Sequence, residues 1–541
     1  KQAKAKVATA VSSSSSAQPS ESKSTSKSSS TSSPKTKTTT STSLIPNNVL
    51  LMAFIAFLGG VFTPPSLHVV REGVNPVSPP EPPTSSSFPL PPYIPCTPTN
   101  LENYIHASPV PGLHVVCIEP IYLGGTDGVV TEQQHLVDED NIDIGRRLRE
   151  TNSLRLTFYK GSHAAPLRRR VQVSGVKNTN NPAGAGSRGG VGVQQTVSWL
   201  DIKTQLIAEL KLDPEGPTQQ PWAVFTALGE RIVGESDSIS RDAEEEGSNE
   251  YIVGNLAASG MVIVAQGGNW MWPGVREGFQ RTIELTSPPS NPNADSNQNN
   301  NISNNNAGTP STRKSHNITI ETLSLKPLVL SIEGFLTNDE CDYIAKKAQP
   351  TMKYSSVSLK DADVGRASSD WRTSQSTFLS ANDDPTLRDI EYRTGSLTRT
   401  PRNHQEYVQV LRYGTSEKYD AHHDYFDPAA YKSDAGTLNL IQYGKKNRFA
   451  TVFWYLTDVE DGGHTIFPRA GGLPPVRSHS DCSKGLKVQP KKGKVIIFYS
   501  LDARGKMDPL SLHGACPVGE GEVKWAANKW IWNAPMGFVS N

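Results

Sequence analysis

The sequence predicts a mainly β protein, with a double-stranded β-helix (jelly roll) and flanking helices in its C-terminal part and a smaller α+β domain before it. Many short apolar runs separated by Gly and Pro recur between residues 407 and 532, as in sandwich and jelly-roll folds. Two polar stretches, rich in Pro and in Asn, divide the 541-residue chain into segments. The hydrophobic share of 35% is low for a fully globular chain, so long unfolded stretches are expected.

The first 43 residues contain Ser, Thr and Lys and almost no apolar side chains. Such a composition cannot build a core, so we predict a disordered basic tail. Its lysines are scattered and no aromatic residues lie between them, which argues against a nucleic-acid partner. The net charge of the whole chain, +1, gives no general attraction to nucleic acid either.

Residues 44–63 are predicted to be a signal-anchor that crosses a membrane. Their central part, Val49–Phe62, is uncharged and mostly apolar, and the flanking tail and Pro-rich run offer nothing to bury it against. The lysines precede it, which places the N-terminus in the cytosol and the rest of the chain in the lumen. The short span suits the thinner membrane of the endoplasmic reticulum, with the Golgi as an alternative location. A cleaved signal peptide is the alternative to an anchor.

The predicted domain organisation follows from the breaks in composition. Residues 64–96 form a Pro-rich, extended linker, and residues 286–320 form an Asn/Ser-rich linker that carries the glycosylation sequons at Asn301 and Asn317. The region between them, 97–285, is predicted to be an α+β domain, with a β-grasp arrangement as one option. The region 321–537 is predicted to be the jelly-roll domain.

The 97–285 region contains four candidate strands and one amphipathic helix. The strands are expected at 154–160, 168–173, 221–228 and 261–266. The helix is expected over 198–212, with its apolar face formed by Leu200, Ile202, Leu206, Ile207 and Leu210. We find no convincing set of ligands or nucleophiles in this region, and its role stays open.

The 321–537 region begins with a helix expected at 339–349 and continues with strands. These strands are expected at 407–413, 449–456, 494–500 and 523–532.

The chemistry of this region starts from KYDAHHDYF (418–426). In an extended strand, residues two apart project from the same face, so His422 and Asp424 can reach one metal ion while His423 points away. A distant His513 completes a set of two histidines and one carboxylate, which leaves positions open on the metal and suits iron(II). Zinc with three protein ligands is the inorganic alternative.

Lys524 indicates that 2-oxoglutarate is a second substrate of the expected iron(II) site. It follows His513 on an expected return strand, and a buried lysine needs an anionic partner. The distal carboxylate of 2-oxoglutarate would supply that partner, and the Tyr413 hydroxyl can hydrogen-bond the same carboxylate. A surface lysine on an edge strand is the alternative reading of Lys524.

Residues 321–536 resemble the catalytic domain of prolyl 4-hydroxylases. The resemblance rests on five segments: IEGFLTNDECDYI (332–344), HQEYVQVLRYGTSEKYDAHHDYF (404–426), TVFWYLTDVEDGGHTIFP (451–468), GLKVQPKKGKVIIFYSL (485–501) and SLHGACPVGEGEVKWAANKWIW (511–532). It implies hydroxylation of peptidyl proline to 4-hydroxyproline with O₂ and 2-oxoglutarate, which releases succinate and CO₂. The implied cofactors are Fe(2+), 2-oxoglutarate and L-ascorbate, and the implied substrate is a proline-rich or collagen-like peptide.

The resemblance also implies roles for individual residues. It places iron on His422, Asp424 and His513, and the distal carboxylate of 2-oxoglutarate on Lys524, with Tyr413 and Thr465 assisting. Arg448, Trp530 and Arg372 match family positions, the first two near the proline of the substrate, and ordinary support of the fold is the alternative for all three. Cys482 and Cys516 occupy positions where the family often has cysteines, so a disulfide between them is a hypothesis, with Cys96–Cys117 as a second pair.

The sequence departs from the family pattern at two points. His464 stands in GGHT where the family usually has Glu in GGET, and the interval from His513 to Lys524 is one residue longer than usual. An extra residue inside a strand would turn the following side chains to the opposite face, so it must be absorbed before Lys524.

Two other functions compete with proline hydroxylation. One is the same iron chemistry on a different residue or on a small molecule. The other is an inactive lumenal scaffold that binds peptides through the 97–285 region. The sequence indicates no oligomeric state.

Overall fold

The computed structural model describes residues 92–121, 153–164, 168–174, 197–213, 216–218, 220, 221–235, 245–286 and 315–536. All of them belong to one compact unit. The predicted tail, the segment 44–63, the linker up to residue 91 and the sequon at Asn301 lie outside the described residues. Within the described ranges, no helix is long and apolar enough to cross a membrane, and the membrane segment stays a prediction.

A six-stranded antiparallel sheet forms the N-terminal lobe, which we define as the described residues 92–279. Its strand order is β3-β2-β1-β6-β4-β5. The strands are β1 (Leu113–Ile121), β2 (Ser153–Tyr159), β3 (Arg168–Ser174), β4 (Ala223–Thr226), β5 (Arg231–Gly234) and β6 (Met261–Ala265), and the helices are α2 (Pro98–Leu101), α4 (Trp199–Leu210) and α5 (Glu245–Ser259). Every strand pair in this sheet is antiparallel. The β-grasp option is therefore wrong, because that fold has a parallel pair at the centre of its sheet.

Helix α4 matches the expected position but buries a different face. Its buried residues are Trp199, Ile202, Leu206 and Leu210, spaced three or four apart along the helix. Leu200 and Ile207, which we expected on the apolar face, are 69% and 40% exposed. Trp199 takes the place of Leu200 because the bulky indole packs on Trp222, with ring centroids 6.2 Å apart.

Two antiparallel sheets form the C-terminal part. The larger has the order β10-β11-β12-β19-β14-β17-β9-β8-β7, and the smaller has the order β13-β18-β15-β16. The strands are β7 (Gln280–Thr286), β8 (Ser315–Leu325), β9 (Leu328–Glu333), β10 (Lys353–Tyr354), β11 (Gln375–Leu379), β12 (Val408–Tyr413), β13 (Tyr419–His422), β14 (Arg448–Tyr455), β15 (Thr465–Phe467), β16 (Leu486–Val488), β17 (Val495–Tyr499), β18 (His513–Ala515) and β19 (Lys524–Trp532).

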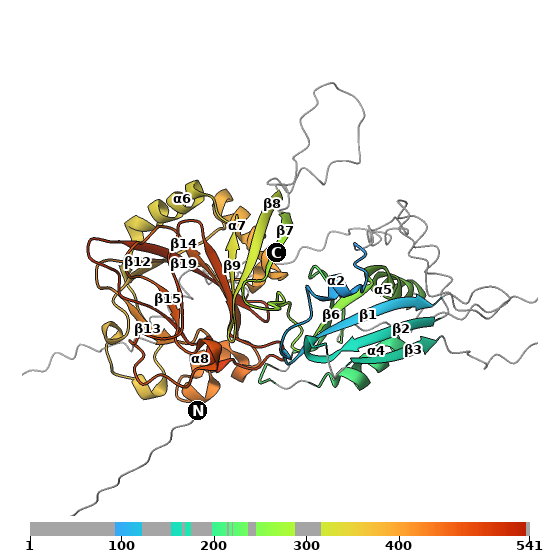
Figure 1. Ribbon diagram of the computed structural model, residues 1–541. Helices are drawn as coiled ribbons and strands as arrows, with labels where there is room; N and C mark the ends of the chain where they lie inside the picture. Colours follow the sequence, from blue (N-terminus) through green and yellow to red (C-terminus); the bar gives the residue numbers. More distant parts are fainter. Residues whose placement is uncertain are drawn as a thin grey trace, which may run out of the picture. The chain divides into compact units, whose positions relative to one another are not determined.

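Side chains of both sheets share one apolar cluster, which includes Tyr413 and Phe498 of the larger sheet and Phe467 of the smaller. Paired antiparallel sheets around a common core are consistent with the predicted jelly roll. Helices α6 (Asn338–Ala348), α7 (Pro385–Thr398) and α8 (Ala435–Leu440) accompany the sheets (Figure 1). Strand β7 falls in the region assigned to the α+β domain, but it pairs with β8 and is the edge of the larger sheet.

Both disulfides expected from the sequence are present. Cys96 is bonded to Cys117, and Cys482 is bonded to Cys516. The fifth cysteine, Cys341, is free and buried in α6.

Two buried histidines make the N-terminal lobe sensitive to acid. Burial lowers the pKa of His106 and of His114 to about 4. The Nδ1 atom of His106 accepts a hydrogen bond from the Val275 N–H, and that of His114 accepts one from the Gly161 N–H. Protonation would place a second hydrogen on each ring against a backbone donor.

We expect the free energy of unfolding to fall as the pH drops below about 6.5, because the unfolded chain then binds protons that the folded chain excludes. The loss is on the order of 2 kcal/mol per histidine by about pH 5, from the 1.36 kcal/mol carried by each pKa unit. Urea unfolding at about pH 7.5 and about pH 5 measures it. The His114→Gln variant should lose less stability over this interval than wild type, and an equal loss would contradict the assignment.

Candidate functional site

The three predicted metal ligands meet where β13 and β18 pair. His422 ends β13, His513 begins β18, and the two residues are directly opposite in the antiparallel register. Asp424 lies two residues beyond the end of β13, so the strand is shorter than we expected. One ligand atom from each of the three residues lies within 4.8 Å of the others.

Backbone carbonyls fix the orientation of both imidazoles. His422 Nδ1 is 2.9 Å from the Asp420 carbonyl oxygen, and His513 Nδ1 is 2.9 Å from that of Ser511. If each Nδ1 carries the proton, both Nε2 atoms are free to bind a metal, and they lie 3.8 Å and 3.5 Å from the Asp424 carboxylate oxygens.

The Asp424 carboxylate is held in its charged form. Burial alone would raise its pKa, but His513, His422 and Arg448 together with a hydrogen bond from Thr451 lower the pKa to about 2. The Thr451 hydroxyl donates to Oδ2 at 2.6 Å. Burial lowers the pKa of His422 well below its usual value, so this ring is neutral. An anionic carboxylate beside imidazole nitrogens is the kind of donor set that a divalent transition metal requires.

Tyr419 stacks on the His422 ring, and Arg372 in turn lies over the Tyr419 ring. The Tyr419 ring lies parallel to that of His422, with centroids 3.7 Å apart and planes at 20°. The Arg372 guanidinium lies 4.6 Å from the centroid of the Tyr419 ring. Arg372 is itself held by a hydrogen bond to the Ser374 hydroxyl at 2.9 Å. The structure thus places Arg372 behind the site, two rings away from the metal position.

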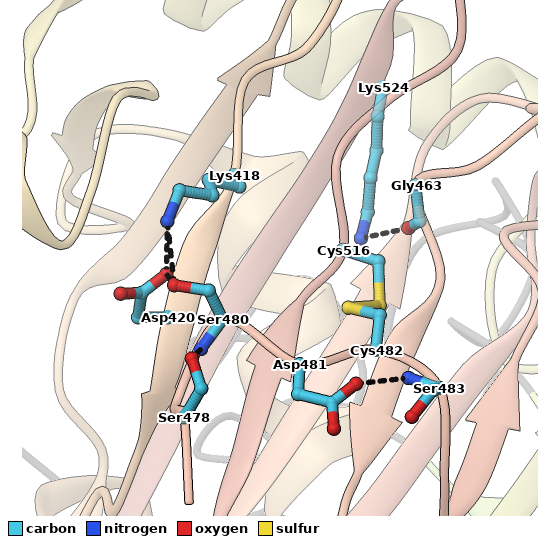
Figure 2. The surroundings of a disulfide bond; sticks show 10 residues. All are labelled: Lys418, Asp420, Gly463, Ser478, Ser480, Asp481, Cys482, Ser483, Cys516 and Lys524. Carbon is cyan, nitrogen blue, oxygen red and sulfur yellow. Dashed lines mark hydrogen bonds and ion pairs between the residues drawn. A yellow bond between two sulfur atoms is a disulfide. The ribbon is translucent and has the colours of Figure 1, made fainter.

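Lys524 is a buried cation with no acidic partner in the described part of the chain. It is 0% exposed, and burial lowers its pKa to about 7 without any contribution from a carboxylate. Its Nζ donates to the Gly463 carbonyl at 2.7 Å, a bond drawn in Figure 2 in the surroundings of the Cys482–Cys516 disulfide. Residues 519–523 form the turn before β19, where we expect the extra residue between His513 and Lys524 to be accommodated.

Aromatic rings and one hydroxyl surround the Lys524 ammonium. The ring centroids of Tyr413, Phe453 and Tyr455 lie 5.4–5.6 Å from Nζ. Tyr413 is the cross-strand partner of Lys524, and the Tyr455 hydroxyl donates to Thr465 Oγ1 at 2.8 Å. Tyr413 and Thr465, both predicted from the sequence, therefore lie with Lys524 in one buried environment that offers an anion a cation and hydroxyl groups.

Arg448 and Trp530 form a second pair. The guanidinium lies 3.6 Å from the centroid of the indole ring. Glu406 accepts two hydrogen bonds from Arg448, at 2.6 and 2.9 Å, which fix its plane. Trp530 Nε1 is buried and has no hydrogen-bond partner among the described residues, so the pair presents an aromatic face and an unused donor.

Two other histidines stay outside the metal group. His423 turns away as predicted, with its Nε2 3.2 Å from the Pro509 carbonyl oxygen and its ring stacked on Tyr425. His464 accepts a backbone hydrogen bond from Cys516 through its carbonyl.

A loop ties the two ligand strands together. The backbone carbonyl of His479 accepts a hydrogen bond from the Ala421 N–H at 2.8 Å. The Ser480 hydroxyl donates to the Asp420 carboxylate at 2.8 Å. Three residues beyond His513, Cys516 is bonded to Cys482 of the same loop (Figure 2). The loop therefore contacts both β13 and the end of β18.

Sequence reasoning missed Tyr419, Thr451 and Phe498, whose ring centroid is 4.4 Å from that of His513. Thr451 had a usable signal, since it is a hydroxyl residue inside the apolar strand FATVFWYL. Tyr419 and Phe498 had none, because aromatic residues within strands are ordinary core residues.

Comparisons with known proteins identify relatives of the C-terminal part. Residues 408–532 match the family model described as the 2OG-Fe(II) oxygenase superfamily. The chain is 41% identical over 220 residues to a probable prolyl 4-hydroxylase 4 of Arabidopsis thaliana, which covers 39% of this chain and 70% of that protein. It is also 41% identical to prolyl 4-hydroxylase 2 of the same plant, over 39% of this chain and 69% of that protein. A solved viral collagen prolyl hydroxylase from Paramecium Bursaria Chlorella virus-1 is 26% identical, with a TM-score of 0.27, over 38% of this chain and 95% of that one.

We expect His422→Ala to weaken binding of a divalent metal by at least about 100-fold, because it removes one of three ligand atoms. Anaerobic titration with iron(II) measures the affinity. The matched control is His423→Ala, which removes the adjacent imidazole that points away, and it should bind iron like wild type. Equal iron affinity in both variants would contradict the ligand set.

Proposed function

We propose a mechanism for this chain, which belongs to the prolyl 4-hydroxylase family of iron(II)- and 2-oxoglutarate-dependent oxygenases. The family membership makes it an oxidoreductase that hydroxylates proline and uses Fe(2+) and 2-oxoglutarate. The identities of the site residues, the form of the substrate and the cellular location are our proposals.

The observation that carries the proposal is the fully buried Lys524 with no carboxylate opposite it among the described residues. A buried ammonium without an anion is costly, so a ligand that brings a carboxylate relieves that cost. Phe498 packs on His513 and belongs to the same cluster as Tyr413 and Tyr455. This cluster connects the metal position with Lys524, as a cosubstrate that reaches from one to the other requires.

His422, His513 and Asp424 would hold iron(II) through two Nε2 atoms and a carboxylate oxygen. When bound, iron with 2-oxoglutarate supplies the oxidising chemistry that inserts an oxygen atom from O₂. Lys524 would pair with the distal carboxylate of 2-oxoglutarate, and Tyr413 and Thr465 would complete its hydrogen bonds. The apolar rings of Phe453, Tyr455 and Phe498 exclude water from this space.

Arg448 and Trp530 would position the proline of the substrate. Arg448 lies close enough to Asp424 to lower the pKa of that carboxyl, which places this pair beside the metal ligands. An aromatic face is suited to a proline ring, and the extended polyproline II conformation costs a peptide little entropy on binding. We propose proline-rich or collagen-like peptides as substrates, with ascorbate as the reductant that restores oxidised iron.

We propose a lumenal site of action in the endoplasmic reticulum, reached through the anchor at 44–63. The two disulfides support an oxidising compartment, since disulfides rarely persist in the cytosol. The sequon at Asn317 is consistent with this location, because Asn317 is the third residue of β8 and is exposed.

We expect proline-rich peptides to gain hydroxyl groups on proline, with one succinate formed per hydroxyl. Mass spectrometry of (Pro)ₙ and Gly-X-Pro peptides, with mapping of the modified residue, measures this and ranks the two substrate classes. The Asp424→Ala variant should form neither product. Turnover of 2-oxoglutarate on another substrate with unmodified proline peptides would contradict the prolyl assignment.

We expect the affinity for 2-oxoglutarate to fall by up to about tenfold for each pH unit above about 7, because the free enzyme must then take up a proton on Lys524 to bind the dianion. Below that pH the ammonium is already charged and the affinity should level off. Isothermal titration of 2-oxoglutarate into the enzyme holding Mn(2+), under anaerobic conditions, measures the profile.

Lys524→Arg keeps its charge at every accessible pH and serves as the control. Its affinity for 2-oxoglutarate can be weaker than that of wild type but should not vary over this range. A wild-type affinity that is constant from about pH 6 to about pH 9 would contradict the role of Lys524.

A further inference from the structure

The N-terminal lobe holds one turn of the C-terminal part. This turn, Asp502–Lys506, follows β17 and precedes His513. The Gly267 N–H donates to the Ala503 carbonyl at 2.7 Å, and the Thr218 hydroxyl donates to the Gly505 carbonyl at 3.1 Å. Thr218 and Ala503 are each 2% exposed, so these bonds are shielded from water.

The lobe approaches the turn so closely that only glycine fits at the contacting positions of the lobe. A Cβ atom on Gly267 would lie 2.6 Å from the Gly505 nitrogen and 2.9 Å from the Arg504 carbonyl carbon. Gly216 lies equally close to the backbone of Gly505, and Gly112 lies against the backbone of Ala503 and Arg504 and against the Arg504 side chain. Most of these obstacles are backbone atoms, which cannot swing aside as a side chain can.

The turn is braced internally. The Asp502 carboxylate accepts hydrogen bonds from the backbone N–H groups of Arg504 and Lys506, at 2.9 and 3.0 Å. It also accepts two from the Arg504 guanidinium, at 2.6 and 3.0 Å. The Asp502 N–H donates to the Lys506 carbonyl at 2.8 Å. A shift imposed on the turn is therefore transmitted along the chain rather than absorbed within it.

A series of hydrogen bonds begins at Ser500 and Asp508, which flank the turn, and leads to the metal ligand. The Asp508 N–H donates to the Ser500 carbonyl at 2.9 Å. The Ser511 hydroxyl donates to the Asp508 carbonyl at 2.7 Å. The Ser511 carbonyl faces Nδ1 of His513 at 2.9 Å and so sets the orientation of the ligand ring.

We propose that the N-terminal lobe is a positioning module for the iron site, acting through the Asp502–Lys506 turn on His513. Gly267 and Thr218 are its positioning residues. This inference rests on the proposed function only in that His513 is an iron ligand. It assigns a role to a lobe that lies outside the matched oxygenase segment, residues 408–532.

The test uses the full chain and iron(II) alone as the probe, with anaerobic titration well below the unfolding temperature. Gly267→Ala forces the lobe and the turn apart, and we expect iron(II) to bind about tenfold more weakly, as when a support of a metal ligand is removed. The matched control is Gly254→Ala, in the same lobe, where an added Cβ meets nothing within 4 Å. It should bind iron like wild type.

Affinity for iron separates positioning from stability, because a merely structural contact would lower the unfolding temperature and leave iron binding by the folded chain unchanged. If Gly267→Ala does not fold, Thr218→Val decides, since it removes one hydrogen bond without adding a clash, and we expect roughly threefold weaker binding. If the folded variant binds iron(II) as tightly as Gly254→Ala does, the role of the lobe is overturned and the proposed function stands. No iron binding by wild type overturns the iron site as well.

Discussion

The register of β13 against β18 is the constraint on which the site depends. It places His422 opposite His513, and the pairing is correct only if both strands keep their alignment to the residue. The carbonyls of Asp420 and Ser511 then orient the two rings, and Asp424 follows where β13 ends. A shift of one residue would turn a ligand away, which explains why the loop with Cys482, Ser480 and His479 contacts both strands.

A charge buried in the larger sheet is the second determinant. Lys524 stands at the start of β19, across from Tyr413, in a space lined by aromatic rings. The interior would not retain an ammonium there for stability, because apolar residues would pack at lower cost. In our proposal, this charge therefore serves an anion that arrives from outside the chain. The aromatic rings around Lys524 make its charge costly when no anion is bound, because they exclude water. For the same reason, they strengthen the attraction between the ammonium and a bound anion.

The sequence allowed prediction of the parts of this design that depend on local patterns and spacing. Alternating apolar runs located β12, β14, β17 and β19, and the H-x-D spacing located two ligands. Most long-range side-chain contacts could not be predicted from the sequence. Tyr419 and Phe498 look like core aromatics until the fold brings them against the two histidines. The face of α4 was misjudged because Trp199 replaces Leu200 in the core, and the antiparallel sheet of the N-terminal lobe depends on pairings that the order of elements does not specify.

The N-terminal lobe and the catalytic sheets meet in close backbone contacts at glycines. In our proposal, these contacts support the iron site from outside the oxygenase segment. In our proposal, this site couples oxidation of 2-oxoglutarate to hydroxylation of a peptidyl proline. A reaction under heavy-oxygen-labelled O₂ with a proline-rich peptide tests this coupling most sharply. We expect label in both the new proline hydroxyl and the succinate, in equal amounts. Labelled succinate with no label in the peptide would contradict it.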